Sequence, residues 1–504
     1  MKYDKLLTSD IKLSQLLKYA LFFSAASYII IYLWMVFYRL QYPFDLEWIE
    51  GGMVDQVQRL VHGESIYIAP SINFVPFLYP PLYFYLSAVT SIVFGDGPFP
   101  LRLVSFSASL VSFTVIFLIV RNETKKLWAA LLSVGLFAAT FRVTGAWLDI
   151  ARVDSLFLAL WLLFIYFIRS RDSFLNSILA GIFAALAFLT KQTALILCLP
   201  VVTYFFWWNK KYALSLLVVA ALIISTTTLL LEHASAGWYT YYVFKLLSQQ
   251  TEWRPWMFAS FWKEDLLVHL PLALLFIIFF LMGKPKQNQP ILLWWASILA
   301  GALAGTFLTR VKVGGYDNVL LPTYATLSIL FGLGLDEALR TIDQLNADYK
   351  DRIEVLIHAI CLIQLIILFY NPYAQIPTAT DLNNGHELIS LLSKVDGDVY
   401  IPDHSHLAIL ADKQTFAHHS AIWDIVRGDQ QTPGKALLEE DLNNAIRQQI
   451  FDMIILDTEW NYCCLEINQY YTKTGEVVYT ENAFYTVTGW KKRPTYIYIA
   501  KRLK

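Results

Sequence analysis

The chain has 504 residues, of which 57% are hydrophobic and 16% charged, with a formal net charge of −1. An average soluble domain has about 25% charged residues. The charges are also uneven, because 29 of the 79 Asp, Glu, Lys and Arg residues fall in 375–504. This pattern indicates a membrane-embedded body, 1–374, followed by a soluble tail, 375–504. It excludes a soluble enzyme, a disordered scaffold and a nucleic-acid-binding protein.

Long apolar runs follow one another from residue 18 onward, and a membrane crossing needs about 20 apolar residues. We expect eleven transmembrane helices, to within a few residues at 18–38, 100–120, 127–144, 155–168, 174–190, 192–208, 212–231, 266–282, 290–308, 318–335 and 353–370. A further apolar run, 79–95, begins with Pro80 and Pro81. Proline suits the start of a helix better than its interior, so this run is expected to lie on the membrane surface.

Basic residues decide the orientation, because cytoplasmic loops carry an excess of Lys and Arg. With the N-terminus in the cytoplasm, 16 basic residues fall on short cytoplasmic connections and eight on the longer external ones before the tail. If 79–95 crossed the membrane, every later loop would change sides. We therefore predict a multi-pass protein of the bacterial inner membrane with its tail outside the cytoplasm.

The first external connection, 41–99, carries three acids within six residues: Asp45, Glu47 and Glu50. They directly precede a Gly pair, 51–52, which would let a ligand or another backbone come close. The next external constellation has Asp149 and Asp154 on either side of Arg152. Charges at a membrane boundary are usually paired or functional. An ion pair of Arg152 with one of these two acids that only seals a helix junction is the alternative.

Two further external loops carry cations. Lys191 lies at the tip of a tight hairpin, where it could hold a phosphate or extend to lipid headgroups. The loop 309–318 contains Arg310 and Lys312 and ends at Asn318. This composition suits an anionic headgroup, and a basic interfacial turn is the alternative.

All four loops share the external face in the predicted orientation. A carboxylate there could take a proton from an acceptor hydroxyl, and the cations could offset negative charge on a departing lipid phosphate. This combination favours transfer of a group from a lipid-phosphate donor.

Five short motifs occur in a fixed order: Asp45-Leu46-Glu47-Trp48-Ile49-Glu50, Pro80-Pro81-Leu82, Leu101-Arg102-Leu103, Ala151-Arg152-Val153-Asp154 and Leu189-Thr190-Lys191. Together they resemble the GT-C membrane glycosyltransferases, in the branch of protein O-mannosyltransferases and aminoarabinose transferases, over about 18–335. The resemblance implies an α-helical polytopic membrane domain with surface helices in its first external loop. It also implies an inverting transferase that uses a polyprenyl-phosphate sugar and faces away from the cytoplasm.

The resemblance further implies that an acid of the first loop is the general base, about fourteen residues before the Gly that ends a surface helix. Here Gly63 ends an amphipathic helix expected over 53–61, and Glu50 stands thirteen residues earlier. We therefore expect Glu50 as the base, with Asp45 and Glu47 as the next choices.

The donor side departs from the family at one point. The family often has Glu-Lys before Pro-Pro-Leu, and this chain has Leu78 and Tyr79 there, which removes one cation from the donor phosphate. The expected donor and phosphate ligands are Arg152, Lys191, Arg310, Lys312 and Asn318. Asp149, Asp154 and Tyr79 are expected to support them.

The tail is predicted to be a small extracytoplasmic α/β accessory domain near the active site. We expect strands at 398–401, 414–417, 453–457, 476–480 and 495–500 and a helix at 439–451. Its cluster of acids and histidines is formed by Asp403, His404, His406, His418 and His419. Their spacing fits no zinc pattern, so we expect a polar loop without metal ligands.

The sequence leaves several partners open. The donor is expected to be a polyprenyl-phosphate-linked sugar, the acceptor a protein, a glycan or a lipid, and the surroundings membrane lipids. No cofactor is assigned, and a requirement for a divalent cation stays open. A transporter or flippase for a lipid-linked saccharide is one alternative function, although it would predict an internal repeat that the sequence lacks. A non-catalytic scaffold with the GT-C fold is the other.

Overall fold

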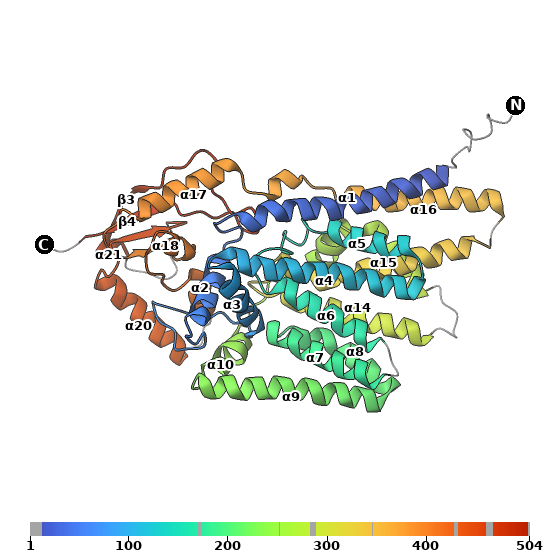
Figure 1. The fold of residues 1–504 in the computed structure, drawn as a ribbon, viewed down its shortest axis with the longest axis horizontal. Coiled ribbons are helices and arrows are strands. Elements are labelled where there is room, and N and C mark those ends of the chain that lie inside the picture. The colour runs from blue at the N-terminus through green and yellow to red at the C-terminus, as the bar shows by residue number, and fades with distance from the viewer. Residues whose placement is uncertain are drawn as a thin grey trace.

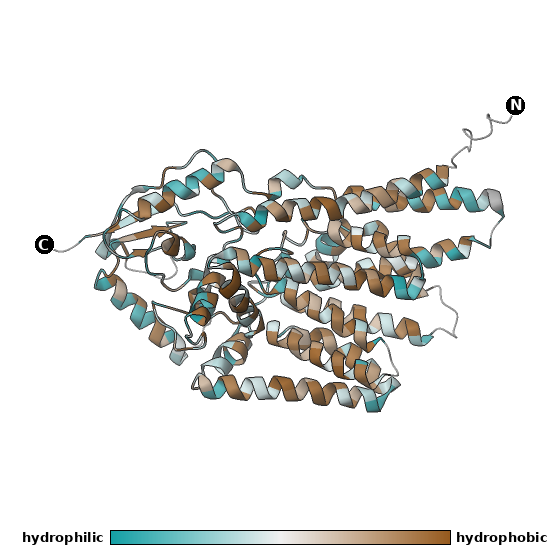
Figure 2. Cartoon of the chain, viewed as in Figure 1, coloured by the Kyte–Doolittle hydropathy of each residue, from teal (hydrophilic) through white to brown (hydrophobic). Residues whose placement is uncertain are grey.

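The protein is seen in a computed structural model that describes residues 13–169, 173–250, 252–282, 289–344, 346–427, 432–459 and 467–501. Its long helices run side by side as an elongated bundle, with the tail at one end and the first described residue, Leu13, at the other (Figure 1). Hydrophobic residues predominate along the middle of the bundle, and hydrophilic ones are more frequent at its two ends (Figure 2). The chain is a mostly helical, multi-pass membrane protein.

Every predicted span falls on a helix. These helices are α1 (Leu13–Gln41), α4 (Pro98–Thr124), α5 (Leu127–Ala139), α6 (Asp154–Ile168), α7 (Phe174–Thr190), α8 (Ala194–Trp208), α9 (Lys210–Ala234), α13 (Pro271–Met282), α14 (Gln289–Arg310), α15 (Leu321–Ile342) and α16 (Ala347–Ile367). Small residues bring neighbouring helices close together. A Cβ on Gly301 of α14 would lie 2.2 Å from the Leu197 carbonyl oxygen of α8.

Length and composition alone identify fewer crossings than the eleven that we predict. Among the described residues, five helices are long and apolar enough to cross a membrane, or seven if two bent helix pairs each count as one span. One bent pair is 257–268 with 271–282, and the other is 349–367 with 372–392. Five further apolar helices have only 10–17 residues. The number eleven therefore stays a prediction.

Two surface helices lie between the bundle and the tail (Figure 1). They are α2 (Glu50–Val61) and α3 (Leu82–Phe94). With 13 residues, α3 is too short to cross a bilayer upright. It buries Tyr83 and Phe84 and leaves Ile92 and Val93 about 70% exposed, as expected of a helix at the membrane surface.

The tail holds a four-stranded mixed sheet in the order β1-β2-β4-β3. Its strands are β1 (Val399–Tyr400), β2 (Met453–Leu456), β3 (Tyr471–Glu476) and β4 (Tyr496–Ala500). β1 is parallel to β2, and β4 runs antiparallel to both β2 and β3. Its helices of eight or more residues are α17 (Ala379–Leu392), α19 (His419–Val426) and α20 (Pro433–Arg447).

Three predictions for the tail were wrong in detail. Residues 414–417 form no strand, and the third strand covers 471–476 instead of 476–480. The predicted helix 439–451 begins six residues earlier, at Pro433, and ends at Arg447. Its start is fixed by Thr432, whose side chain accepts a hydrogen bond from a backbone N–H of the first turn, and by proline at the first helical position.

Candidate active site

The four loops that are predicted to be external meet at the end of the bundle that carries the tail. Arg152 of the second loop contacts Glu47 of the first. Asp154, at the start of α6, accepts hydrogen bonds from Lys191 of the hairpin and from Asn318 of the fourth loop. Residues far apart in the chain therefore form one continuous polar cluster beneath the tail.

Glu47 faces a guanidinium in a buried pocket. Nη1 of Arg152 lies 3.0 and 3.1 Å from the two carboxylate oxygens, and Nη2 donates to the Tyr79 hydroxyl at 2.9 Å. Burial raises the pKa of Glu47 to about 7, although the charge of Arg152 opposes that shift. A carboxylate with a pKa near neutrality can both take and release a proton at physiological pH.

A small cleft is connected to this pair through Asp154, a lining residue whose carboxylate interacts with the charge of Arg152. Its lining includes Asp154, Lys191, Asn318, Thr306 and Phe157. Lys191 Nζ lies 2.6 Å from Asp154 Oδ1, and its side chain is 13% exposed. The second carboxylate oxygen, Oδ2, is buried and has no hydrogen-bond partner among the described residues. The cleft therefore offers a cation and a buried acceptor atom to a ligand.

The predicted cations of the fourth loop are held more firmly by the protein itself. Arg310 forms ion pairs with Asp265 at 2.8 Å and with Asp317 at 2.9 Å. Lys312 lies over the ring of Trp253, 5.7 Å from its centroid. Lys191 is paired as well, but it lines the cleft and neither of these cations does, which makes Lys191 the better placed of the predicted phosphate ligands.

Glu50 lies in a different environment from Glu47. It is fully buried and accepts four hydrogen bonds. Two come from Arg102, at 3.0 and 2.6 Å, and two from the backbone N–H groups of Leu46 and Ala151, at 2.7 and 2.6 Å. This saturated carboxylate is suited to fixing the loop, and the geometry does not favour it as the base.

Asp45 faces the tail. Its Oδ2 lies 2.8 Å from His404 Nδ1, and His404 Nε2 lies 3.2 Å from Asp457. Burial on its own lowers the pKa of His404, but the two carboxylates raise it to about 10. The imidazolium therefore ties the first loop to the tail.

The Gly pair serves the same junction. A Cβ on Gly51 would lie 3.3 Å from His406, and one on Gly52 would lie 2.7 Å from the ring of His418. Histidines of the tail therefore pack closely against the two glycines, where a side chain would leave no room for them.

Comparison with known proteins shows which family and which solved structures the chain resembles. Residues 79–238 match the family described as dolichyl-phosphate-mannose-protein mannosyltransferase. The fold is similar to that of ArnT from Cupriavidus metallidurans bound to undecaprenyl phosphate, with a TM-score of 0.62, 11% identity, and coverage of 95% of this chain and 98% of that one. Part of the chain thus resembles this mannosyltransferase family, and the chain as a whole shares the fold of ArnT.

A second solved structure has a similar fold, with a lower TM-score. The oligosaccharyltransferase of Archaeoglobus fulgidus, in complex with Zn and sulfate, aligns with a TM-score of 0.53 and 12% identity, over 89% of this chain and 71% of that one. At such identities the likeness concerns the fold alone. No curated protein matches the chain in sequence.

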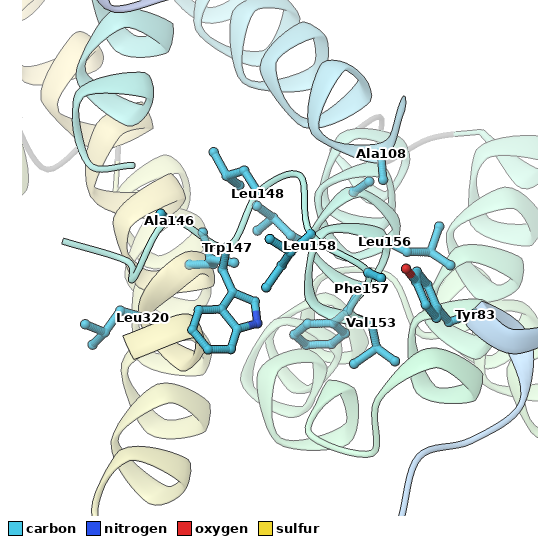
Figure 3. Close-up of a cluster of buried hydrophobic side chains, with 14 of the residues drawn as sticks. Tyr83, Ala108, Ala146, Trp147, Leu148, Val153, Leu156, Phe157, Leu158 and Leu320 are labelled. Carbon is cyan, nitrogen blue, oxygen red and sulfur yellow. The ribbon is translucent and has the colours of Figure 1, made fainter. Parts of the chain in front are cut away.

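The loop that contains Asp149 and Arg152 is held by two ion pairs with other parts of the chain. Asp149 pairs with Arg39 at 2.5 Å, and Arg152 pairs with Glu47, so neither forms the junction-sealing pair with the other that the sequence left open. Below the loop lies an apolar floor. Figure 3 shows Trp147, Val153 and Phe157 on one side of this segment, between Leu320 and Tyr83 of α3. Packing of this kind fixes the position of Arg152.

Sequence reasoning missed several side chains that pair with residues of the candidate site. Arg39 and Arg102 are both fully buried, and each donates to a carboxylate of the site region. A signal existed, since both arginines stand at the external end of predicted spans, where basic residues are scarce. Asp265, the partner of Arg310, carried no comparable signal.

The histidines of the tail form contacts with neighbouring loops. Among the described residues, no group of three or more His, Cys, Asp or Glu side chains is placed to hold a metal ion. His419 Nδ1 lies 3.0 Å from Asp403, which also accepts from Lys492 at 2.6 Å. Cys463 and Cys464 lie outside the described residues.

Proposed function

We propose that the enzyme transfers a sugar from a polyprenyl-phosphate donor to a hydroxyl acceptor, with inversion, and that Glu47 is the general base. Glu47 takes the proton of the acceptor hydroxyl, and the acceptor oxygen forms a bond to C1 of the sugar. The bond from C1 to the donor phosphate breaks, and polyprenyl phosphate leaves with the electron pair. The reaction needs no oxidant or reductant, and the proton ends on the carboxylate.

One observation carries this proposal: the cleft of Lys191 and Asp154 is connected through Asp154 to the Glu47–Arg152 pair. One N–H of the Lys191 ammonium donates to Asp154, which leaves two N–H donors without a partner among the described residues. These can bind an oxygen of the donor phosphate. The buried Asp154 Oδ2, which has no partner among the described residues, can accept a hydrogen bond from a sugar hydroxyl.

The choice of base differs from the first choice made on sequence. Glu50 already accepts four hydrogen bonds, and Asp45 is bound to His404. Burial raises the pKa of Asp45, but the contacts with His404 outweigh it and lower the pKa, which weakens Asp45 as a base. In Glu50 both oxygens are already occupied by hydrogen-bond donors. Glu47 has a raised pKa of about 7 and therefore accepts a proton more readily.

The proposal includes the predicted orientation. The site and the tail, 375–504, face away from the cytoplasm, and 1–374 form the catalytic membrane domain with eleven spans. In a bacterial cell this is the outer face of the inner membrane. The uneven distribution of Lys and Arg between the loops supports this orientation.

The test uses the purified full chain in lipid nanodiscs and a panel of radiolabelled polyprenyl-phosphate sugars. We expect wild type to release polyprenyl phosphate from at least one donor, and Glu47→Gln to bind that donor without turnover. Glu64→Gln, on the exposed face of the same loop, is the matched control and should behave as wild type. Turnover by Glu47→Gln at the wild-type rate would contradict the assignment of the base.

A further inference from the structure

A tryptophan of the tail lies in the open beside the site. Trp490 is 60% exposed, and it is the one aromatic side chain among the described residues of the tail that is so exposed. One face of its ring is stacked on Trp48 of the first loop, with centroids 5.3 Å apart and planes at 17°. Its outer face is left free for a ligand.

The backbone around Trp490 is built to hold it there. Gly489 has a φ of +75°, and a Cβ on it would lie 1.8 Å from the ring of Trp48. The preceding Thr488 donates its N–H to the Leu46 carbonyl at 2.9 Å and accepts from Arg39 at 3.0 Å. Isolated exposed aromatic residues are common, but this one is stacked on the loop that carries Glu47, and the nearby Thr488 is hydrogen-bonded to the same loop.

Aromatic contacts connect Trp490 with the reacting groups. Trp48 packs edge-on against Trp147, with centroids 5.6 Å apart. Trp147 lies 5.7 Å from the guanidinium of Arg152, which pairs with Glu47 at 3.0 Å. Trp490, Trp48 and Trp147 thus form a row of three indole rings that leads from the exposed ring to Arg152, the partner of Glu47.

Polar residues lie near the stacked rings of Trp490 and Trp48. Lys491 is exposed, and Asp317, next to the Tyr316 that packs on Trp48 at 5.2 Å, has a side chain that is 26% exposed. An exposed indole face with an exposed charged residue next to it in the chain matches a sugar ring, which has C–H bonds on its faces and hydroxyls on its edge. A lipid chain would need an apolar border instead.

We propose that the acceptor is a carbohydrate and that Trp490, backed by Trp48, is the subsite for its sugar ring. This inference rests on the proposed function, because it names the acceptor of that reaction. The tail then has a direct part in acceptor binding.

The test measures the binding of two kinds of ligand to the full chain in nanodiscs, and of a competing peptide. One is undecaprenyl phosphate, and the other is a panel of reducing-end-labelled oligosaccharides that covers hexoses, deoxyhexoses, hexosamines and pentoses. The variants are Trp490→Ala, Trp490→Phe and the control Trp256→Ala, whose side chain is 67% exposed. A peptide with Ser and Thr residues is added as a competing acceptor class.

We expect at least one oligosaccharide to bind wild type and Trp256→Ala equally, and Trp490→Ala at least tenfold more weakly. Trp490→Phe should recover most of the affinity, and undecaprenyl phosphate should bind all four proteins alike. Binding of undecaprenyl phosphate without any binding of oligosaccharide that depends on Trp490 would overturn the subsite. Peptide binding that is lost in Trp490→Ala would overturn the carbohydrate class. Absence of undecaprenyl phosphate binding by wild type would instead count against the proposed function.

Discussion

Arg102 donates to both carboxylate oxygens of Glu50, through Nε at 3.0 Å and Nη2 at 2.6 Å. The same guanidinium also donates to the backbone carbonyls of Arg39, Tyr42 and Phe44. One buried ion pair thus fixes the path of the chain from the end of α1 into the loop that carries Glu47. We expect the two glutamates of this loop to have separate tasks, a structural one for Glu50 and a chemical one for Glu47.

Substitution should separate these tasks. Glu50→Gln leaves Arg102 as a buried, partly unpaired charge, and breaking such a pair costs roughly 3–5 kcal/mol. We expect a clear fall in melting temperature, measured by the loss of folded protein in detergent on heating. Glu47→Gln should melt within a few degrees of wild type and lose transfer activity. Equal melting of wild type and Glu50→Gln would show that the pair does not fix the loop.

The pH dependence of transfer should report the titration of Glu47. The base acts when ionised, so the rate should rise about tenfold per pH unit below 7 and level off above it, because the pKa of Glu47 is raised to about 7. The charges that act on it are those of Arg152 and Glu50. The measurement is the rate of release of polyprenyl phosphate from pH 5 to 9.

Asp55 provides the control for this profile. Burial also raises its pKa to about 7, and Ser405 donates to it, but it faces the tail and not the cleft. Asp55→Asn should therefore keep the same acid limb. A limb that vanishes in Asp55→Asn, or one centred near pH 4, would contradict the assignment to Glu47.

The sequence predicted the helices and the four loops well, because both depend on local signals. Apolar runs and clusters of charge are read within about 20 residues of chain. The pairing of the charges could not be read in this way. Glu50 pairs with Arg102, which is 52 positions away, and Asp45 with His404, which is 359 positions away. Glu50 was therefore preferred by its spacing from Gly63, while the raised pKa of Glu47, on which our proposal rests, depends on its surroundings in the folded protein.

Lys191 should contribute to donor binding and little to stability. A hydrogen bond to a charged group is worth about 1.5–3 kcal/mol, which corresponds to roughly a 10–100-fold change in affinity. We expect Lys191→Met to weaken binding of undecaprenyl phosphate by that factor and Lys191→Arg to recover part of it. Lys245→Met, an exposed lysine outside the cleft, should bind as wild type. Equal affinities of wild type and Lys191→Met would remove Lys191 from the phosphate site.

The junction between the first loop and the tail depends on Gly52. In Gly52→Ala the new Cβ would lie 2.7 Å from the ring of His418 and 2.8 Å from that of Phe77. Overpacking of this kind typically costs about 1–3 kcal/mol. We expect faster proteolysis of the tail and slower transfer. Gly475→Ala is the control, since a Cβ there meets nothing within 4 Å, and similar proteolysis of the two variants would contradict this role of Gly52.

His404 should make the attachment of the tail depend on pH. Its folded pKa is raised to about 10 from an unfolded value of 6.5, so the stability that it contributes is present in full below pH 6.5 and is lost as pH rises toward 10. The groups that face it are Asp45, Asp457 and, at longer range, His418.

The melting temperature of wild type should therefore fall from pH 6.5 to 10, and that of His404→Gln should start lower and change less over the same range. His62→Gln, on the exposed end of α2, should follow wild type. Parallel curves for wild type and His404→Gln would mean that the imidazole is not the proton-binding link between the first loop and the tail. If His404→Gln also lowers the rate of transfer at pH 7 while its melting temperature stays well above the assay temperature, the link positions the loop of Glu47 as well as holding the tail.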